Sequence, residues 1–225
     1  MPGSSFTAAS TLTGKGMAGT PAVKKRVAVL ISGRGSNMVA LIEAAKAKDY
    51  PATIALVASS RPDAPGLGLA RAAGIETAIV DHRQFGEERE AFERALDAQL
   101  QMHRVDLVCL AGFMRILTAD FVRRWSGRML NIHPALLPQF KGLHTHRRAL
   151  EAGAKQHGAT VHFVVAEMDS GPIVAQESVP VLEADTEETL AQRVLEVEHR
   201  IYPEALRLVA EGRARFTASS EQAAG

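Results

Sequence analysis

The stretch Arg26-Val-Ala-Val-Leu-Ile-Ser-Gly-Arg-Gly-Ser-Asn37 decides the fold of this chain of 225 residues. Its apolar first part, residues 26–32, predicts a buried strand. The glycines that follow, Gly33 and Gly35, predict a tight turn, and apolar residues at helical spacing then continue from Asn37 to residue 48. A strand that passes through a glycine turn into a helix opens a βαβ unit, which places the next strand parallel to the first.

The same alternation continues along the chain. We predict further strands over residues 53–58, 75–80, 105–111 and 128–132, and helices over residues 65–73 and 87–103. Unbroken apolar strands between helices are typical of a parallel sheet covered on both faces. Residues 159–167 and 173–181 predict an antiparallel pair, and residues 186–211 predict a last helix. The predicted class is α/β, an open, mostly parallel twisted sheet with helices on both faces, an antiparallel C-terminal strand pair and a long C-terminal helix.

Composition and charge exclude several classes of protein. The chain has 26 basic and 25 acidic residues, a net charge of +1 and 5% aromatic residues, which argues against a nucleic-acid-binding surface. No apolar run is long enough to span a bilayer. The single cysteine, Cys109, allows no internal disulfide and fits a reducing compartment, so we expect a cytoplasmic protein. We expect small-molecule partners, no nucleic acid and no membrane, while a homodimer stays open.

The two ends of the chain differ from the body. Residues 1–25 are rich in Ser, Thr, Gly and Ala and contain no acid, which predicts a disordered N-terminal extension. A later start at Met17 and a transit peptide remain alternatives. Residues 26–216 are predicted to form a single domain, whose N-terminal half holds the phosphate site described below. Residues 217–225 are predicted to be a loose tail.

Asn131, His133 and Asp169 are the candidate catalytic residues. Asn131 and His133 stand two residues apart on an extended segment, so their side chains face the same side. Asp169 follows a strand-like run, where a second loop can bring its carboxylate to His133. An amide that holds an oxyanion, a histidine that moves protons and an aspartate that orients it suit acyl transfer to a nucleophile of the substrate. The alternative is ordinary turn chemistry beside Pro134 and Pro172.

The turn at residues 33–37 is a candidate anion site. Backbone N–H groups at the start of a helix bind anions. The dinucleotide-binding pattern requires glycine where Met38 stands, and the P-loop sequence Gly-Lys-Ser/Thr is absent. The sequence therefore favours a monophosphate ligand, and the alternative is a plain strand–helix turn without a ligand.

Two further polar clusters leave alternatives open. His144 and His146 together with His133 have the residue types of a zinc site, but they equally suit contact with an anion or the capping of a helix that starts there. We expect no metal. Glu198, with its neighbour His199, precedes Pro203, which should kink the last helix. Glu198 and His199 are either ligand contacts or part of a solvated face.

The whole body of the chain, residues 26–216, resembles the phosphoribosylglycinamide formyltransferases, a folate-dependent formyltransferase family also called glycinamide ribonucleotide transformylases. The stretches that carry the resemblance are residues 29–37 (VLISGRGSN), 110–117 (LAGFMRIL), 131–138 (NIHPALLP), 142–146 (GLHTH) and 198–203 (EHRIYP). The resemblance implies a Rossmann-like formyltransferase fold. It also implies transfer of the formyl group of 10-formyltetrahydrofolate, as cosubstrate, to the amine of 5′-phosphoribosylglycinamide in purine biosynthesis, without a metal.

The resemblance also implies roles for individual residues. Asn131, His133 and Asp169 would be catalytic. The substrate phosphate and ribose would be bound by Gly35, Ser36, Asn37 and Glu198. The folate would be bound by Arg89, Met114, Arg115, Ile116, Leu117, Asn131, Val165, Ala166, Glu167, Met168 and Asp169, so that the C-terminal half supplies a folate loop. This chain departs from the family pattern at Gln139 and Lys141, where the family often has Lys and Pro.

Three other functions fit part of the pattern. A 10-formyltetrahydrofolate hydrolase would share Asn131, His133 and Asp169 and use water as the acceptor. We expect an N-terminal regulatory domain in that family, and residues 1–25 are too short for one. A methionyl-tRNA formyltransferase is expected to carry a C-terminal RNA-binding domain. A sensor that binds nucleotide or folate without turnover is disfavoured by the intact catalytic residues.

Overall fold

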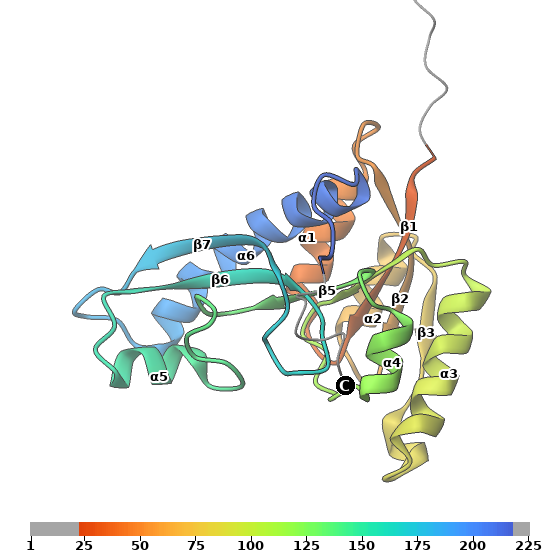
Figure 1. The fold of residues 1–225 in the computed structure, drawn as a ribbon, viewed down its shortest axis with the longest axis horizontal. Helices are drawn as coiled ribbons and strands as arrows, with labels where there is room; N and C mark the ends of the chain where they lie inside the picture. Colours follow the sequence, from red (N-terminus) through yellow and green to blue (C-terminus); the bar gives the residue numbers. More distant parts are fainter. Residues whose placement is uncertain (1–22, 218–225) are drawn as a thin grey trace, which may run out of the picture.

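A seven-stranded sheet with the order β3-β2-β1-β4-β5-β6-β7 forms the centre of the protein in a computed structural model that describes residues 23–217. The strands are β1 (Lys25–Ile31), β2 (Ala52–Ser59), β3 (Thr77–Ile79), β4 (Leu107–Leu110), β5 (Met129–His133), β6 (Gln156–Phe163) and β7 (Ile173–Pro180). The pairs from β3 to β5 are parallel, whereas β6 runs antiparallel to both β5 and β7. In Figure 1 the long β6 and β7 extend beyond the parallel strands.

Helices cover both faces of this sheet. They are α1 (Ser36–Ala45), α2 (Gly66–Ala72), α3 (Arg89–Met102), α4 (Ala119–Arg124), α5 (Thr145–Glu151) and α6 (Glu187–Ala210), with a short 3-10 helix η1 (His82–Phe85). Figure 1 shows α1 and α6 together on one side of the sheet and α3 and α4 on the other. The predicted fold class is confirmed.

Alternation along β1 explains why both faces need helices. Val27, Val29 and Ile31 are fully buried in a core formed with α1, α2 and α6. Ala28 and Leu30 are fully buried in a second core, formed with α3 and α4. Successive side chains of a strand point to opposite faces, so a strand without polar residues must be covered on both sides.

The last helix, α6, is hydrogen-bonded to the central strands of the sheet through a tyrosine. The Tyr202 hydroxyl is buried and lies within hydrogen-bond distance of two carbonyls of the sheet, those of Leu110 in β4 (3.0 Å) and Leu130 in β5 (3.2 Å). The Tyr50 hydroxyl donates to the carbonyl of Pro203 at 2.7 Å. The helix continues through Pro203 to Ala210. The predicted kink at this proline stays a prediction.

Several predicted boundaries are wrong, and the largest error lies at β6. This strand ends at Phe163, not at residue 167, so Val165, Ala166 and Glu167 lie in a loop. Apolar residues continue past the strand end, and the sequence pattern therefore extended the strand too far. Strand β3 and helix α1 are shorter than predicted. The short elements η1 and α4 have too few turns to produce a periodic signal, and the sequence did not predict them.

The predicted extension and tail fall largely on residues 1–22 and 218–225, which lie outside the described residues. Within the described part, β1 begins at Lys25, one residue before the predicted domain boundary. Near the other end, the Phe216 ring packs edge-on against Phe163 with centroids 5.7 Å apart. No helix in residues 23–217 is long and apolar enough to cross a membrane.

Candidate active site

The carboxyl ends of the parallel neighbours β1, β4 and β5 meet at one edge of the sheet. Ser32, directly after β1, donates its backbone N–H to the carbonyl of Gly112 at 3.1 Å. The Ser32 hydroxyl oxygen accepts the N–H of Met114 at 2.9 Å. Ligands of open α/β sheets bind outside these strand ends, so this edge is the candidate site.

Asn131 lies on β5 opposite His162 of β6. The two residues are cross-strand partners, and Asn131 Nδ2 is 3.2 Å from His162 Nε2. His162 Nδ1 lies 2.9 Å from the carbonyl of Phe163, which can only accept, so Nδ1 carries the proton. Burial lowers the pKa of His162, which favours this neutral ring. In the neutral ring Nε2 accepts, and it therefore fixes the orientation of the Asn131 amide.

His133 has an oxygen acceptor beside each ring nitrogen. Its Nε2 is 3.0 Å from the carbonyl of Phe140, and its Nδ1 is 3.4 Å from Asp169 Oδ2. The side chain is only 7% exposed. A histidine whose two nitrogens both face acceptors is satisfied best when both carry protons. The geometry thus suits an imidazolium at this position.

Asp169, in the loop after β6, contacts the end of β5 and the loop that contains Gly142. Its Oδ2 accepts the N–H of Gly142 at 2.8 Å, and its Oδ1 is 3.7 Å from His162 Nε2. Asp169 has a positive φ of 51°. Gly171 makes this turn possible, because a Cβ there would lie 1.8 Å from the carbonyl oxygen of Phe163. The structure therefore brings Asn131, His133 and Asp169 together, as predicted.

The glycine turn after β1 leads into α1 and contacts α6. Gly35 precedes α1 with a backbone φ of 77°, a value that residues other than glycine rarely adopt. Asn37 Nδ2 donates to Glu198 Oε2 at 2.5 Å, and Asn37 Oδ1 is buried without a protein partner. Glu198 is 8% exposed, so it does not belong to a solvated face. Burial raises the pKa of its carboxyl group.

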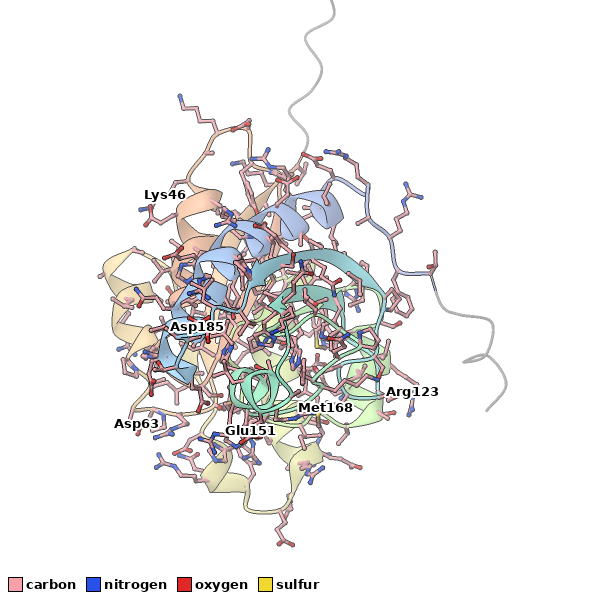
Figure 2. The ribbon with its side chains drawn as sticks, turned by 90° about the vertical axis from the view of Figure 1, so that its left-hand side faces the viewer. Lys46, Asp63, Arg123, Glu151, Met168 and Asp185 are labelled. Atoms are coloured by element: carbon pink, nitrogen blue, oxygen red, sulfur yellow. The ribbon has the colours of Figure 1, made fainter. Side chains whose placement is uncertain are left out.

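The two segments predicted to bind folate are loops with exposed apolar side chains. Met114 and Ile116 follow β4 and are 66% and 64% exposed. Met168, labelled in Figure 2, belongs to the loop after β6 and is 53% exposed. Leu117 and Val165 are half-buried, as is Arg115. Exposed apolar groups of this size beside the polar candidate catalytic residues suit a flat, partly apolar ligand.

Arg89 is the first residue of α3, and its side chain is exposed. One turn later on the same helix, Phe92 stacks on Phe113, with ring centroids 6.4 Å apart. Phe113 directly precedes Met114. The start of α3 is therefore joined to the predicted folate segment through two aromatic rings.

The histidines do not form the zinc site that their residue types allowed. His144 is exposed, whereas the His146 ring packs edge-on against the buried His157 with centroids 5.2 Å apart. Within residues 23–217 no three His, Cys, Asp or Glu side chains are arranged to hold a metal ion. His144 stands at the N-cap of α5 but makes no capping hydrogen bond with its side chain. The capping alternative is therefore also wrong.

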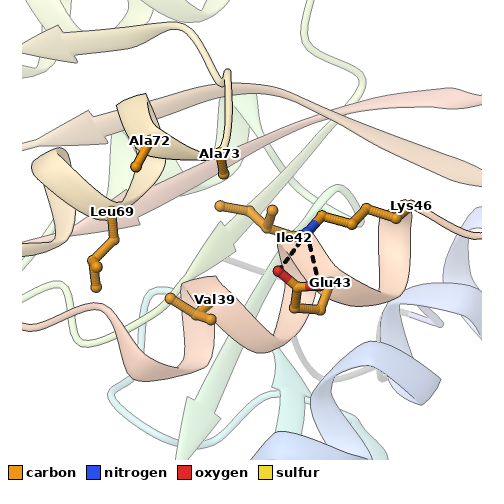
Figure 3. Close-up of a pocket in the computed structure, with 7 residues that line it drawn as sticks. All are labelled: Val39, Ile42, Glu43, Lys46, Leu69, Ala72 and Ala73. Carbon is orange, nitrogen blue, oxygen red and sulfur yellow. Dashed lines mark hydrogen bonds and ion pairs between the residues drawn. The ribbon is translucent and has the colours of Figure 1, made fainter.

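A shallow depression elsewhere on the surface is not the candidate site. Figure 3 shows it between α1 and α2, with the ion pair of Glu43 and Lys46 at its rim. It is lined by Val39, Ile42, Glu43, Lys46, Leu69, Ala72 and Ala73. None of these residues belongs to the candidate catalytic, phosphate-binding or folate-binding residues.

Comparison with known proteins identifies the family. The family model described as formyl transferase matches residues 25–206. The phosphoribosylglycinamide formyltransferase of Escherichia coli is 48% identical over 190 residues, which are 84% of this chain and 89% of that protein. The chain belongs to the formyl transferase family. The resemblance inferred from the sequence motifs is confirmed.

Other relatives of this formyl transferase differ in length. The crystal structure of phosphoribosylglycinamide formyltransferase from Brucella melitensis has a TM-score of 0.80 and 52% identity, covering 86% of this chain and 100% of that one. The trifunctional purine biosynthetic protein adenosine-3 of Gallus gallus is 52% identical over 189 residues, 84% of this chain. The chain spans only 19% of the length of that relative.

Three residues near the site of this formyl transferase were missed by sequence reasoning. His162 orients Asn131, and Ser32 holds the backbone of Met114. Glu93, a buried carboxylate on α3, binds Thr118 at the end of the 114–117 segment. The sequence held no signal for His162, whose role depends on the pairing of β6 with β5. Glu93 had none either, since its partner lies far away in the sequence.

Proposed function

We propose that this chain transfers the formyl group of 10-formyltetrahydrofolate to the amine of 5′-phosphoribosylglycinamide, a step of purine biosynthesis. The observation that carries the proposal is the contact of His133 with Asp169, beside Asn131, at the strand ends of a formyl transferase. This arrangement offers oxyanion donors and a proton carrier but no protein nucleophile. The amine of the acceptor substrate supplies the nucleophile.

The nucleotide binds at the turn after β1. Gly35, Ser36 and Asn37 hold the phosphate at the start of α1, where helix N–H groups lack partners. Glu198 accepts the ribose hydroxyls. The hydrogen bond between Asn37 and Glu198 supports this division, because it joins the phosphate turn to the ribose-binding helix.

The folate binds across the two loops that flank the catalytic residues. The residues assigned to it are Arg89, Met114, Arg115, Ile116, Leu117, Asn131, Val165, Ala166, Glu167, Met168 and Asp169. Lys141 supports the second loop, because its Nζ donates to Ser170 Oγ at 2.5 Å and lies 3.4 Å from Glu167. No step of the proposal requires a metal.

The reaction runs through a tetrahedral intermediate. The amine nitrogen bonds to the formyl carbon, and the formyl oxygen takes on negative charge. The Asn131 amide and protonated His133 donate to this oxygen, which for His133 replaces the contact with the Phe140 carbonyl. Removing one such donor typically lowers the rate by about 10²–10³-fold. Collapse then breaks the bond from the formyl carbon to N10.

Proton balance is completed at the leaving group. The attacking amine loses a proton and N10 of the folate gains one, which leaves tetrahydrofolate and the formylated amine, a formamide. Asp169 stabilises the charged imidazolium of His133 by charge pairing. Holding both substrates at one sheet edge further lowers the barrier, by up to roughly 7–11 kcal/mol in favourable cases.

A formyl-transfer assay tests the proposal. Loss of 10-formyltetrahydrofolate is followed with and without 5′-phosphoribosylglycinamide. We expect consumption that depends on the nucleotide, with one formylated nucleotide formed for each folate consumed. Consumption without nucleotide would instead establish a hydrolase. Binding of both ligands without any turnover would establish a sensor.

A further inference from the structure

Glu93 is a buried carboxylate that the proposed reaction does not use. It lies on α3, is 1% exposed and is surrounded by the apolar core that contains Phe92 and Leu96. A carboxylate in such a place is costly unless its oxygens are hydrogen-bonded. An apolar side chain would fill the same space, so packing alone does not explain an acid at this position.

Both oxygens of Glu93 bind one residue. Oε1 accepts the backbone N–H of Thr118 at 2.6 Å, and Oε2 accepts its hydroxyl at 2.5 Å. The same hydroxyl accepts the N–H of Phe121 at 3.3 Å and so caps α4. Hydrogen bonds to a charged acceptor are stronger than neutral ones. Glu93 therefore fixes the position and orientation of Thr118 relative to α3.

Thr118 is the residue that ends the 114–117 segment. At its other end, the segment is held by Ser32, whose Oγ accepts the N–H of Met114 and lies 2.8 Å from Ser60 Oγ. Between these two anchors Met114 and Ile116 are exposed. A short backbone held at both ends loses little conformational entropy when a ligand binds it.

We infer that Glu93 is a positioning residue that holds the 114–117 segment ready for the folate cosubstrate. The inference rests on the proposed function, because it takes the ligand of this segment to be folate. Glu93 does not touch the ligand; it acts through Thr118. Its removal should weaken folate binding and leave nucleotide binding at the 33–37 turn unchanged, because the side chain of Glu93 binds Thr118 and not that turn.

Steady-state kinetics of four variants test this role. Glu93→Gln removes the charge of the acceptor, and Thr118→Val removes the hydroxyl donor. Thr118→Ser keeps the hydroxyl and should therefore retain folate binding. We expect Glu93→Gln and Thr118→Val to raise KM for 10-formyltetrahydrofolate by about 5- to 20-fold, corresponding to partial loss of charged hydrogen bonds. KM for the nucleotide should stay within about twofold, since no contact to α1 changes.

Asp97→Asn is the matched control. Asp97 lies one turn further along α3 and accepts the indole N–H of Trp125 at 2.9 Å, so it also joins α3 to α4 but bypasses the segment. This variant should not raise KM for 10-formyltetrahydrofolate relative to KM for the nucleotide. An equal rise in both KM values for Glu93→Gln, or the same separation in Asp97→Asn, would overturn the inference.

Hydrogen exchange separates this inference from the proposed function. If the unaltered protein shows no formyl transfer, the proposed function fails, and exchange at the amides of residues 114–118 decides about Glu93. Faster exchange at these amides in Glu93→Gln, and not in Asp97→Asn, supports the positioning role. Unchanged exchange would contradict it, whatever the ligand of the segment is.

Discussion

At the residue scale, Asp169 is the candidate site residue whose carboxylate contacts groups from several segments. Its carboxylate contacts His133 and the N–H of Gly142, and it lies near His162. These groups come from β5, β6 and the loop between them. A single carboxylate thus joins the candidate catalytic histidine to the loop that contains Gly142.

Asp169→Asn should lower kcat by about 10²-fold while it changes KM by less, because the amide keeps an acceptor for Gly142 but loses the charge that stabilises the imidazolium. Steady-state kinetics with both substrates measure this. Asp49→Asn is the matched control, since Asp49 is exposed, pairs with Arg207 and belongs to none of the candidate site residues. A larger change in KM than in kcat would make Asp169 a binding residue.

Glu198 should make stability depend on pH. Burial raises the pKa of its carboxyl group in the folded state above the ordinary value of 4.5. The folded state then binds a proton more readily than the unfolded state, so stability falls as pH rises from 4.5 through the folded-state pKa. Above that range the loss is constant.

Glu198→Gln removes this dependence. Urea unfolding at several pH values should show the stability of the variant relative to the original chain increasing from acid to neutral pH. Glu196→Gln, an exposed position on the same helix, is the control. A difference that does not change with pH would refute the burial argument.

The candidate residues were predictable where local geometry decides. Asn131 and His133 share a side because they stand two apart on a strand. The carboxylate expected beside His133 is present, since Asp169 Oδ2 lies 3.4 Å from His133 Nδ1. His162 was missed because its role depends on the register between β5 and β6. Register between strands joined by a long connection cannot be derived from one sequence.

At the element scale, the loop after β6 determines where Asp169 lies. Sequence reasoning continued this strand to residue 167, because Val164, Val165 and Ala166 are typical of a strand. In the structure the chain turns away after Val164, whose N–H donates to the carbonyl of Met129. It returns at Gly171, which packs directly on Phe163. The turn is decided by this tertiary contact, which the local pattern does not contain.

Gly171→Ala should therefore destabilise the protein and displace Asp169. A Cβ placed 1.8 Å from the Phe163 carbonyl oxygen forces the backbone to move, at a cost of about 1–3 kcal/mol. Chemical denaturation and turnover should both report the change. Gly68→Ala is the control: no atom lies within 4 Å of its Cβ, and alanine in a helix should stabilise by about 0.5–1 kcal/mol. Equal stability of the two variants would contradict the packing argument.

At the scale of the whole molecule, two cores on opposite faces hold the sheet. The sequence predicted this arrangement because strands without polar residues alternate with helices. The order of the strands and the short helix α4 were not predicted, since both follow from contacts between distant segments. The location of the candidate site follows from the parallel strands themselves, because their carboxyl ends lie at one edge of the sheet.

Leu41→Ala on α1 and Leu96→Ala on α3 probe the two cores separately. Both side chains are at most 2% exposed, and each variant should lose about 2–5 kcal/mol of unfolding free energy. Leu69→Ala, at a position 50% exposed beside the depression of Figure 3, should lose far less. Urea unfolding measures all three. Loss from only one core variant would show that the two faces do not fold as one unit.

The most direct measurement is single-turnover formyl transfer by His133→Ala with both substrates bound. We expect a rate at least about 10²-fold below that of the unaltered chain, with both substrates still bound, because a donor to the oxyanion is lost. Near-normal transfer by this variant would contradict the assignment of His133, and with it the proposed mechanism.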